Sequence, residues 1–311
     1  YRIVRSEGGA ATEVASSQAA SDLGSVMLEN VAAEVGLDFR HGAFRFGVSN
    51  DVTAMMGGGL CWLDYDSDGW LDLFVVNSYV PSDTLAWEAR GGLPRSALFR
   101  NLHGRFEDVS ASSGVDLPLR GNGCVAADLD LDGHTDLYVT SAGYNVPTEG
   151  YDALLWNDGD GTFTEGARRA GIDARGWHAG AAVGDVNEDG LPDLFVAGYT
   201  DTNIPNASSS SGFPSNYRAV RDVLYLNQGV DTNGRATFRE VGRAAGIERH
   251  KLGHGLGAAM FDYDLDGLPD IFAANGHIEE AFGRVQPKVQ FKQTARLFRN
   301  LGGGRFARVA P

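Results

Sequence analysis

Four short segments of the sequence place acidic side chains at one fixed spacing. They begin at Asp64, Asp128, Asp185 and Asp262, and each reads D-x-[DN]-x-D-G-x-x-D before an apolar run. Side-chain oxygens at positions 1, 3, 5 and 9, with a backbone carbonyl at position 7, can surround one hard cation. The predicted ligands are Asp64, Asp66, Asp68, Trp70 and Asp72; Asp128, Asp130, Asp132, His134 and Asp136; Asp185, Asn187, Asp189, Leu191 and Asp193; Asp262, Asp264, Asp266, Leu268 and Asp270, with Trp70, His134, Leu191 and Leu268 acting through their carbonyls.

Calcium is the cation that this spacing favours. Magnesium keeps more waters and needs stricter octahedral geometry, and an EF-hand would need a glutamate at position 12, where this chain has Val75, Val139, Val196 and Ala273. The turns could instead be simple polar hairpins. However, two carboxylates about 4 Å apart repel by about 4 kcal/mol at an effective dielectric near 20, in each of four turns. We therefore expect about four structural Ca²⁺ ions.

The elements that position these turns form a repeat. After each turn come an apolar block that ends at Asn101, Asn157, Asn227 or Asn300 and a block that opens with Phe106, Phe163, Phe238 or Phe306. Short β-branched and aromatic runs between Gly, Asp and Asn residues predict four strands per repeat, such as residues 123–127, 136–140, 153–156 and 162–165. A further copy of the last block starts at Leu28. The sequence predicts an all-β propeller of four-stranded antiparallel blades, with four complete repeats, a partial one and about five blade positions.

The lengths of the segments within each repeat show which parts are constant and which parts vary. The distance from the opening aromatic residue to the glycine near the end of its block is constant, whereas the segment between the second and third strands varies. The variable loops should share the end opposite the Asp-rich turns, and loops on a rigid scaffold commonly carry function. The ligand-face candidates there are Trp87, Tyr144, Trp177, Tyr199, Tyr217 and His277.

Composition bounds the remaining possibilities. The formal charge of -15 disfavours nucleic-acid binding, and no apolar run is long enough to span a membrane. The polar residues 1–25 predict a flexible lead-in before a propeller domain over 26–311, without an apolar signal sequence. Cys61 and Cys124 lie at different distances before their first aspartate, so their side chains should point to opposite sheet faces, and we expect buried free thiols.

The turns, the L-[FYW]-x-N blocks and the F-x-[DE]-V-x-x-x-[AS]-G-[IV] segments resemble the FG-GAP/VCBS repeats of integrin α-type propellers. They are most similar to the cartilage acidic protein and ASPIC/UnbV family, over roughly residues 26–309. The resemblance implies a calcium-binding propeller, here without the C-terminal ASPIC/UnbV domain and with ring closure unexplained. The chain could therefore be a fragment or belong to a larger assembly.

Two functions follow from these features. The first is a calcium-stabilised module that binds a protein or glycan partner through its variable loops. The second, implied by biosynthetic members of the family, is an enzyme with a pocket at the propeller mouth, where His178 and His254 are the candidate catalytic residues. Extracellular calcium modules bind at about 10⁻⁴ to 10⁻³ M, which millimolar calcium saturates, so we expect a secreted or periplasmic protein.

Overall fold

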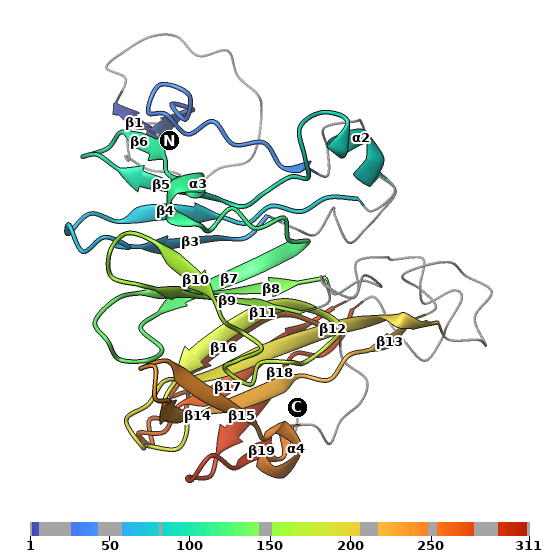
Figure 1. Ribbon diagram of the computed structural model, residues 1–311. Coiled ribbons are helices and arrows are strands. Elements are labelled where there is room, and N and C mark those ends of the chain that lie inside the picture. The colour runs from blue at the N-terminus through green and yellow to red at the C-terminus, as the bar shows by residue number, and fades with distance from the viewer. Residues whose placement is uncertain are drawn as a thin grey trace, which may run out of the picture.

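The described residues form four antiparallel β-sheets of four main strands each, one for each predicted complete repeat, and a separate two-stranded pair (Figure 1). The structure is a computed structural model, and it describes residues 2–5, 26–42, 58–80, 83–142, 151–205, 217–247, 254–276 and 292–309. We call the sheets blades 1 to 4 and their four main strands A to D in chain order. In each blade these strands pair consecutively.

The strand bounds agree closely with those predicted. Blade 1 contains β3 (Leu60–Leu63), β4 (Asp72–Val75), β5 (Ala97–Asn101) and β6 (Phe106–Asp108). Blade 2 contains β7 (Gly121–Ala127), β8 (Asp136–Ser141), β9 (Ala153–Asn157) and β10 (Phe163–Glu165). Blade 3 contains β11 (Trp177–Gly184), β12 (Asp193–Pro205), β14 (Val223–Val230) and β15 (Ala236–Glu240), with β13 (Tyr217–Ala219) paired to β12. Blade 4 contains β16 (Gly255–Phe261), β17 (Asp270–Asn275), β18 (Arg296–Asn300) and β19 (Phe306–Arg308).

The blades stack face to face in chain order, with an apolar core between each neighbouring pair. Because side chains alternate along a strand, Leu137 of β8 packs toward blade 1 while the adjacent Tyr138 packs toward blade 3. Fully buried side chains form the three cores: Phe74, Leu98 and Leu137 between blades 1 and 2; Tyr138, Leu154 and Leu194 between blades 2 and 3; Phe195, Leu224 and Ile271 between blades 3 and 4. This stacking fits a propeller, and closure of the ring stays a prediction.

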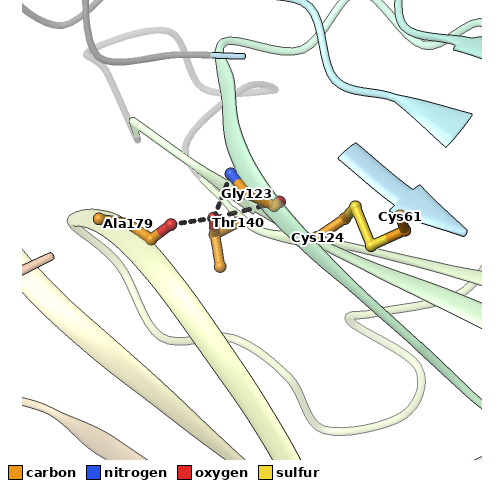
Figure 2. Close-up of a disulfide and its surroundings, with 5 residues drawn as sticks. All are labelled: Cys61, Gly123, Cys124, Thr140 and Ala179. Carbon is orange, nitrogen blue, oxygen red and sulfur yellow. Dashed lines mark hydrogen bonds between the residues drawn. A yellow bond between two sulfur atoms is a disulfide. The ribbon is translucent and has the colours of Figure 1, made fainter. Parts of the chain in front are cut away.

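The A strands of neighbouring blades approach one another closely at glycine residues. A Cβ atom on Gly123 of β7 would lie 2.7 Å from the carbonyl oxygen of Ala179 on β11. The hydroxyl of Thr140 spans the same joint, since it accepts the N–H of Gly123 at 2.9 Å and donates to the carbonyl of Ala179 at 3.1 Å (Figure 2). Small residues on strand A therefore let neighbouring blades meet through their backbones.

Cys61 and Cys124 form a disulfide that joins blades 1 and 2, with their Cα atoms 6.1 Å apart (Figure 2). The prediction of free thiols was wrong. The two side chains lie on opposite faces of their own blades, as expected, but the stacking of blades turns those opposite faces toward each other. The sequence predicts on which face of its sheet each cysteine lies, but this pairing also depends on which blades are neighbours.

The fifth copy of the last repeat block packs against blade 1. Its first residues form β2 (Val26–Glu29), which pairs with β1 (Arg2–Arg5), the only part of the predicted lead-in that the structure describes. The N–H of Phe106 donates to the carbonyl of Val35 at 2.6 Å, as the N–H of Phe238 does to that of Ala170 at 2.7 Å. The fifth copy thus contacts blade 1 as the end of blade 2 contacts blade 3.

In the described ranges the helices are single turns at the margins of the blades: α2 (Thr84–Glu88), α3 (Ser110–Ser113) and α4 (Gly242–Ala245). Among the described residues, no helix has the length and apolar character needed to cross a membrane.

Candidate metal centres

Each Asp-rich segment forms the tight turn between strands A and B of its blade. Position 6 is a glycine with φ between 83° and 93° in all four turns: Gly69, Gly133, Gly190 and Gly267. A Cβ atom on any of them would meet nothing within 4 Å, so the backbone angle rather than space requires glycine. Position 4 also has a left-handed φ of 59° to 61°, at Ser67, Leu131, Glu188 and Leu265. The sequence did not reveal this second unusual position, because its residue types have nothing in common.

The aspartate at position 1 holds the turn through two backbone N–H groups. In blade 2, Asp128 accepts the N–H of Asp132 at 3.1 Å through Oδ1 and that of Gly133 at 2.9 Å through Oδ2. The corresponding bonds occur in the other three turns. The aspartate at position 5 then accepts the N–H of position 7, at 2.9 to 3.1 Å in all four turns. The aspartates at positions 1 and 5 thus close the turn through hydrogen bonds from its own backbone N–H groups.

The aspartate at position 9 is the most deeply buried member of the cluster. Asp136 accepts the N–H of Leu129 through Oδ2 and that of Asn157 through Oδ1, both at 2.9 Å. Its equivalents Asp72, Asp193 and Asp270 accept the same pair of donors. Burial raises the pKa of Asp136 to about 8 and that of Asp193 to about 6. A charge that is disfavoured by burial is what a bound cation would stabilise.

Three of the four turns bring carboxylate oxygens together as a cation site requires. One oxygen from each aspartate at positions 1, 3 and 9 lies within 4.8 Å of the others, and these sets are Asp64, Asp66 and Asp72; Asp128, Asp130 and Asp136; Asp262, Asp264 and Asp270. In blade 3 position 3 is Asn187, whose amide oxygen could take the same place. Positions 5 and 7 are not part of these clusters, and the predicted role of all five positions as ligands stays a prediction.

Two buried oxygens in these clusters are not satisfied by any hydrogen bond within the described residues. Oδ1 of Asp66 and Oδ1 of Asp130 are buried and have no hydrogen-bond partner in the described part of the chain. The Asp130 side chain is completely buried, and leaving a carboxylate oxygen unsatisfied there is costly. A divalent cation with oxygen ligands would satisfy both atoms, so the donor set fits Ca²⁺.

In blades 2, 3 and 4, the asparagine of the repeated strand C block connects the turn of its own blade to that of the preceding blade. Nδ2 of Asn227 donates to the carbonyl of Pro192 in its own turn at 3.2 Å and to that of Leu129 in the turn of blade 2 at 2.8 Å. Asn157 and Asn300 make the same two bonds to their own and the preceding turn. The sequence marked these asparagines as a repeated block end, but their role between blades required the stacking.

The histidines predicted at the mouth are buried and engaged within the protein. His178 is fully buried, and its Nδ1 lies 2.8 Å from Oδ2 of Asp152, which also accepts the hydroxyl of Tyr138 at 2.5 Å. His254 Nδ1 lies 3.0 Å from Nε2 of Gln293. A catalytic role for either histidine stays a prediction.

The ligand-face candidates fall into two groups. Trp87, Trp177 and Tyr199 are buried, and the rings of Trp177 and Tyr199 meet edge to face at 4.5 Å. These three side chains support the variable end from inside. Tyr144 and His277 lie outside the described residues, and Tyr217 is described only as part of β13. Their contact with a partner stays a prediction.

Comparison with known proteins agrees with the repeat pattern. Residues 64–139 and 140–196 match the model of the FG-GAP-like repeat. Cartilage acidic protein 1 from Homo sapiens is 25% identical over 210 residues, covering 55% of this chain and 30% of that protein. The Mus musculus protein is 24% identical over 210 residues, covering 55% and 31%. The chain thus spans about a third of the length of these curated relatives.

Two solved structures show weaker likeness. An Agrocybe aegerita lectin that recognises non-reducing terminal N-acetylglucosamine aligns with a TM-score of 0.39 and 17% identity, covering 85% of this chain and 54% of the lectin. The V. cholerae biofilm matrix protein Bap1 aligns with a TM-score of 0.36 and 16% identity, covering 81% and 39%. Neither score supports a functional argument. Residues 64–196 match FG-GAP-like repeats, and about half of the chain shows weak homology to cartilage acidic protein 1.

Proposed function

We propose that this protein is a calcium-stabilised interaction module. Its four A–B turns bind about four structural Ca²⁺ ions, and the opposite end of the blades contacts a protein or glycan partner. The observation that carries the calcium proposal is the pair of buried, unsatisfied oxygens, Oδ1 of Asp66 and Oδ1 of Asp130, inside clusters of three carboxylates. Bound Ca²⁺ would offset the repulsion within each cluster and hold strand A to strand B.

Calorimetric titration of the chelator-treated protein with CaCl₂ tests this proposal. We expect about four sites, with dissociation constants of about 10⁻⁴ to 10⁻³ M as in extracellular modules. Asp130→Asn should remove or weaken one site, because it takes a negative charge from the cluster of blade 2. Glu107→Gln changes the same charge at an exposed position of blade 1 and should leave the titration unchanged. Absence of calcium binding by the wild-type protein would refute the proposal.

The interaction surface is assigned to the connections between strands B and C. All four lie at the end of the blades opposite the A–B turns, because consecutive strands are antiparallel. They vary in length while the blades stay constant, and this combination suits recognition on a rigid scaffold. The inter-blade disulfide, a durable feature mainly in oxidising compartments, and the similarity to cartilage acidic protein 1 support a secreted or periplasmic location.

Replacement of one variable connection tests the interaction surface. We expect that exchanging residues 206–216 for a short Gly-Ser linker lowers capture of partners from extracellular extracts or glycan arrays, without changing the melting temperature. A matched exchange in the short C–D turn at residues 231–234, on the calcium end, should leave capture intact. Equal capture by both variants would contradict the proposed surface.

A further inference from the structure

Three of the Asp-rich turns lie against an arginine that contacts the carboxylates at positions 3 and 5. In each case the arginine engages the same two atoms, Oδ2 of position 3 and Oδ2 of position 5. The distances are 2.6 and 3.5 Å from Arg100 to Asp66 and Asp68, 3.0 and 3.2 Å from Arg235 to Asp130 and Asp132, and 2.8 and 3.1 Å from Arg299 to Asp264 and Asp266. The recurrence indicates one role served three times.

These arginines reach their turns from two different places in the fold. Arg100 and Arg299 immediately precede the final asparagine of strand C in their own blades. In blade 2 this strand position holds Trp156, and the arginine comes instead from the C–D turn of blade 3. The Arg235 guanidinium lies 5.7 Å from the centre of the Trp156 ring and also contacts Asp158. Two separate origins for the same contact argue that the contact itself matters.

The turn of blade 3 has no arginine at the position before the asparagine of strand C, but it also has one aspartate fewer than the other turns. Leu226 stands there, and position 3 is the neutral Asn187. The Nδ2 group of Asn187 donates to Oδ2 of Asp189 at 2.9 Å, the same atom of position 5 that the arginines contact elsewhere. Four aspartates and one arginine leave a formal charge of -3, and three aspartates with Asn187 also leave -3. When the contacting arginine is counted with the side chains at positions 1, 3, 5 and 9, all four turns therefore carry a formal charge of -3.

We propose that Arg100, Arg235 and Arg299 are counter-charges that set the cation affinity of these turns. They stabilise the turns when no cation is bound, and they weaken cation binding by repulsion. The inference rests on the proposed calcium function. Within the turns the arginines contact Oδ2 atoms, and Oδ1 of Asp66 and Oδ1 of Asp130 remain available, so arginine and cation can be held by different oxygens of one carboxylate. Two positive groups that share a carboxylate repel each other, most strongly where solvent is excluded.

Arg235 should have the largest effect of the three. Its side chain is 23% exposed, compared with 38% for Arg100 and 47% for Arg299, so water screens its charge least. It also connects two blades, and removing it should destabilise the cation-free protein more than the cation-bound one. Loss of this repulsion is expected to tighten calcium binding about tenfold, which corresponds to about 1.4 kcal/mol.

Calcium titration and melting of Arg235→Gln test the inference, with Arg239→Gln as the matched control. Arg239 lies on the neighbouring strand β15 and contacts Gln228 instead of the turn. We expect one site in Arg235→Gln to bind Ca²⁺ about tenfold more tightly, together with a lower melting temperature in EDTA. The control should change neither quantity. Unchanged or weaker calcium binding by Arg235→Gln would overturn the inference.

A second variant tests the same idea without removing a contact between blades. Asn187→Asp makes the turn of blade 3 one charge more negative, and we expect tighter calcium binding at that site and a lower melting temperature in EDTA. Weaker binding would contradict the charge-matching argument. These outcomes differ from failure of the calcium function itself, because in that case the wild-type protein would show no calcium binding at all.

Discussion

One buried aspartate outside the turns, Asp222, makes the folding stability of this protein depend on pH. Asp222 immediately precedes strand C of blade 3 and accepts the N–H of Gly198 at 3.0 Å, and its Oδ2 lies 3.7 Å from Nη1 of Arg296. Burial raises the pKa of Asp222 to about 6, although the Gly198 N–H and Arg296 oppose the shift. The folded protein therefore binds this proton more tightly than the unfolded chain does, and folding is favoured where Asp222 is protonated.

The pH dependence of stability should reveal this group. As pH rises from about 4 to about 6, the unfolding free energy of the calcium-free protein should fall by about 2 to 3 kcal/mol through Asp222. Asp222→Asn keeps an acceptor for the Gly198 N–H but cannot ionise, so its stability should fall less over this range. Urea denaturation in EDTA across the range measures the difference, with Glu107→Gln as the control. An equal fall in wild type and Asp222→Asn would contradict the assignment.

At the residue scale, side-chain chemistry could be predicted wherever the repeat displayed it. The clustering of positions 1, 3 and 9 and the positive φ of Gly133 followed from spacing and residue type. The contacts of Arg235 and the bond between Asp152 and His178 did not, because each joins residues from two blades. The sequence pattern of a single repeat does not show which residues of another blade its side chains contact.

The strands are held to their neighbours by polar connections at the turn end as well as by apolar cores. Nδ2 of Asn227 bonds a carbonyl in its own turn and another in blade 2, whereas Nδ2 of Asn101 bonds Leu71 in its own turn. Both asparagines also accept the N–H of a glycine in their C–D turns. They differ mainly in the bond to a preceding blade.

A comparison of two alanine variants should isolate that bond. We expect Asn227→Ala to lower the unfolding free energy by about 1 to 1.5 kcal/mol more than Asn101→Ala, since one additional buried hydrogen bond is lost. Chemical denaturation in saturating calcium gives both values. Equal destabilisation would show that the bond between blades contributes nothing measurable.

Element boundaries were predictable because turn residues delimit every strand, and period-two alternation then assigned side chains to faces. Which sheet faces of neighbouring blades contact each other could not be predicted from these local patterns. Cys61 and Cys124 were placed correctly on opposite faces and yet assigned the wrong chemical state, because the stacking order decides which faces meet. The elements were local properties of the sequence, and the disulfide was a property of their assembly.

In the molecule as a whole, the repeated turns are separate from the connections that vary in length between repeats. Asp-rich turns and asparagine bonds lie at one end of the stacked blades, and strands B end at the other (Figure 1). Calcium bound at the first end would stiffen the frame that presents the second. The central claim is that the turn ends of the blades depend on calcium for their stability.

Melting of the protein in millimolar CaCl₂, in MgCl₂ and in EDTA tests that claim most directly. With dissociation constants near 10⁻⁴ M and about four sites, calcium should raise the melting temperature by about ten degrees or more over EDTA, while magnesium has a much smaller effect. Identical melting in calcium and EDTA would contradict the account, since turns that need no cation cannot be calcium centres that stabilise the fold.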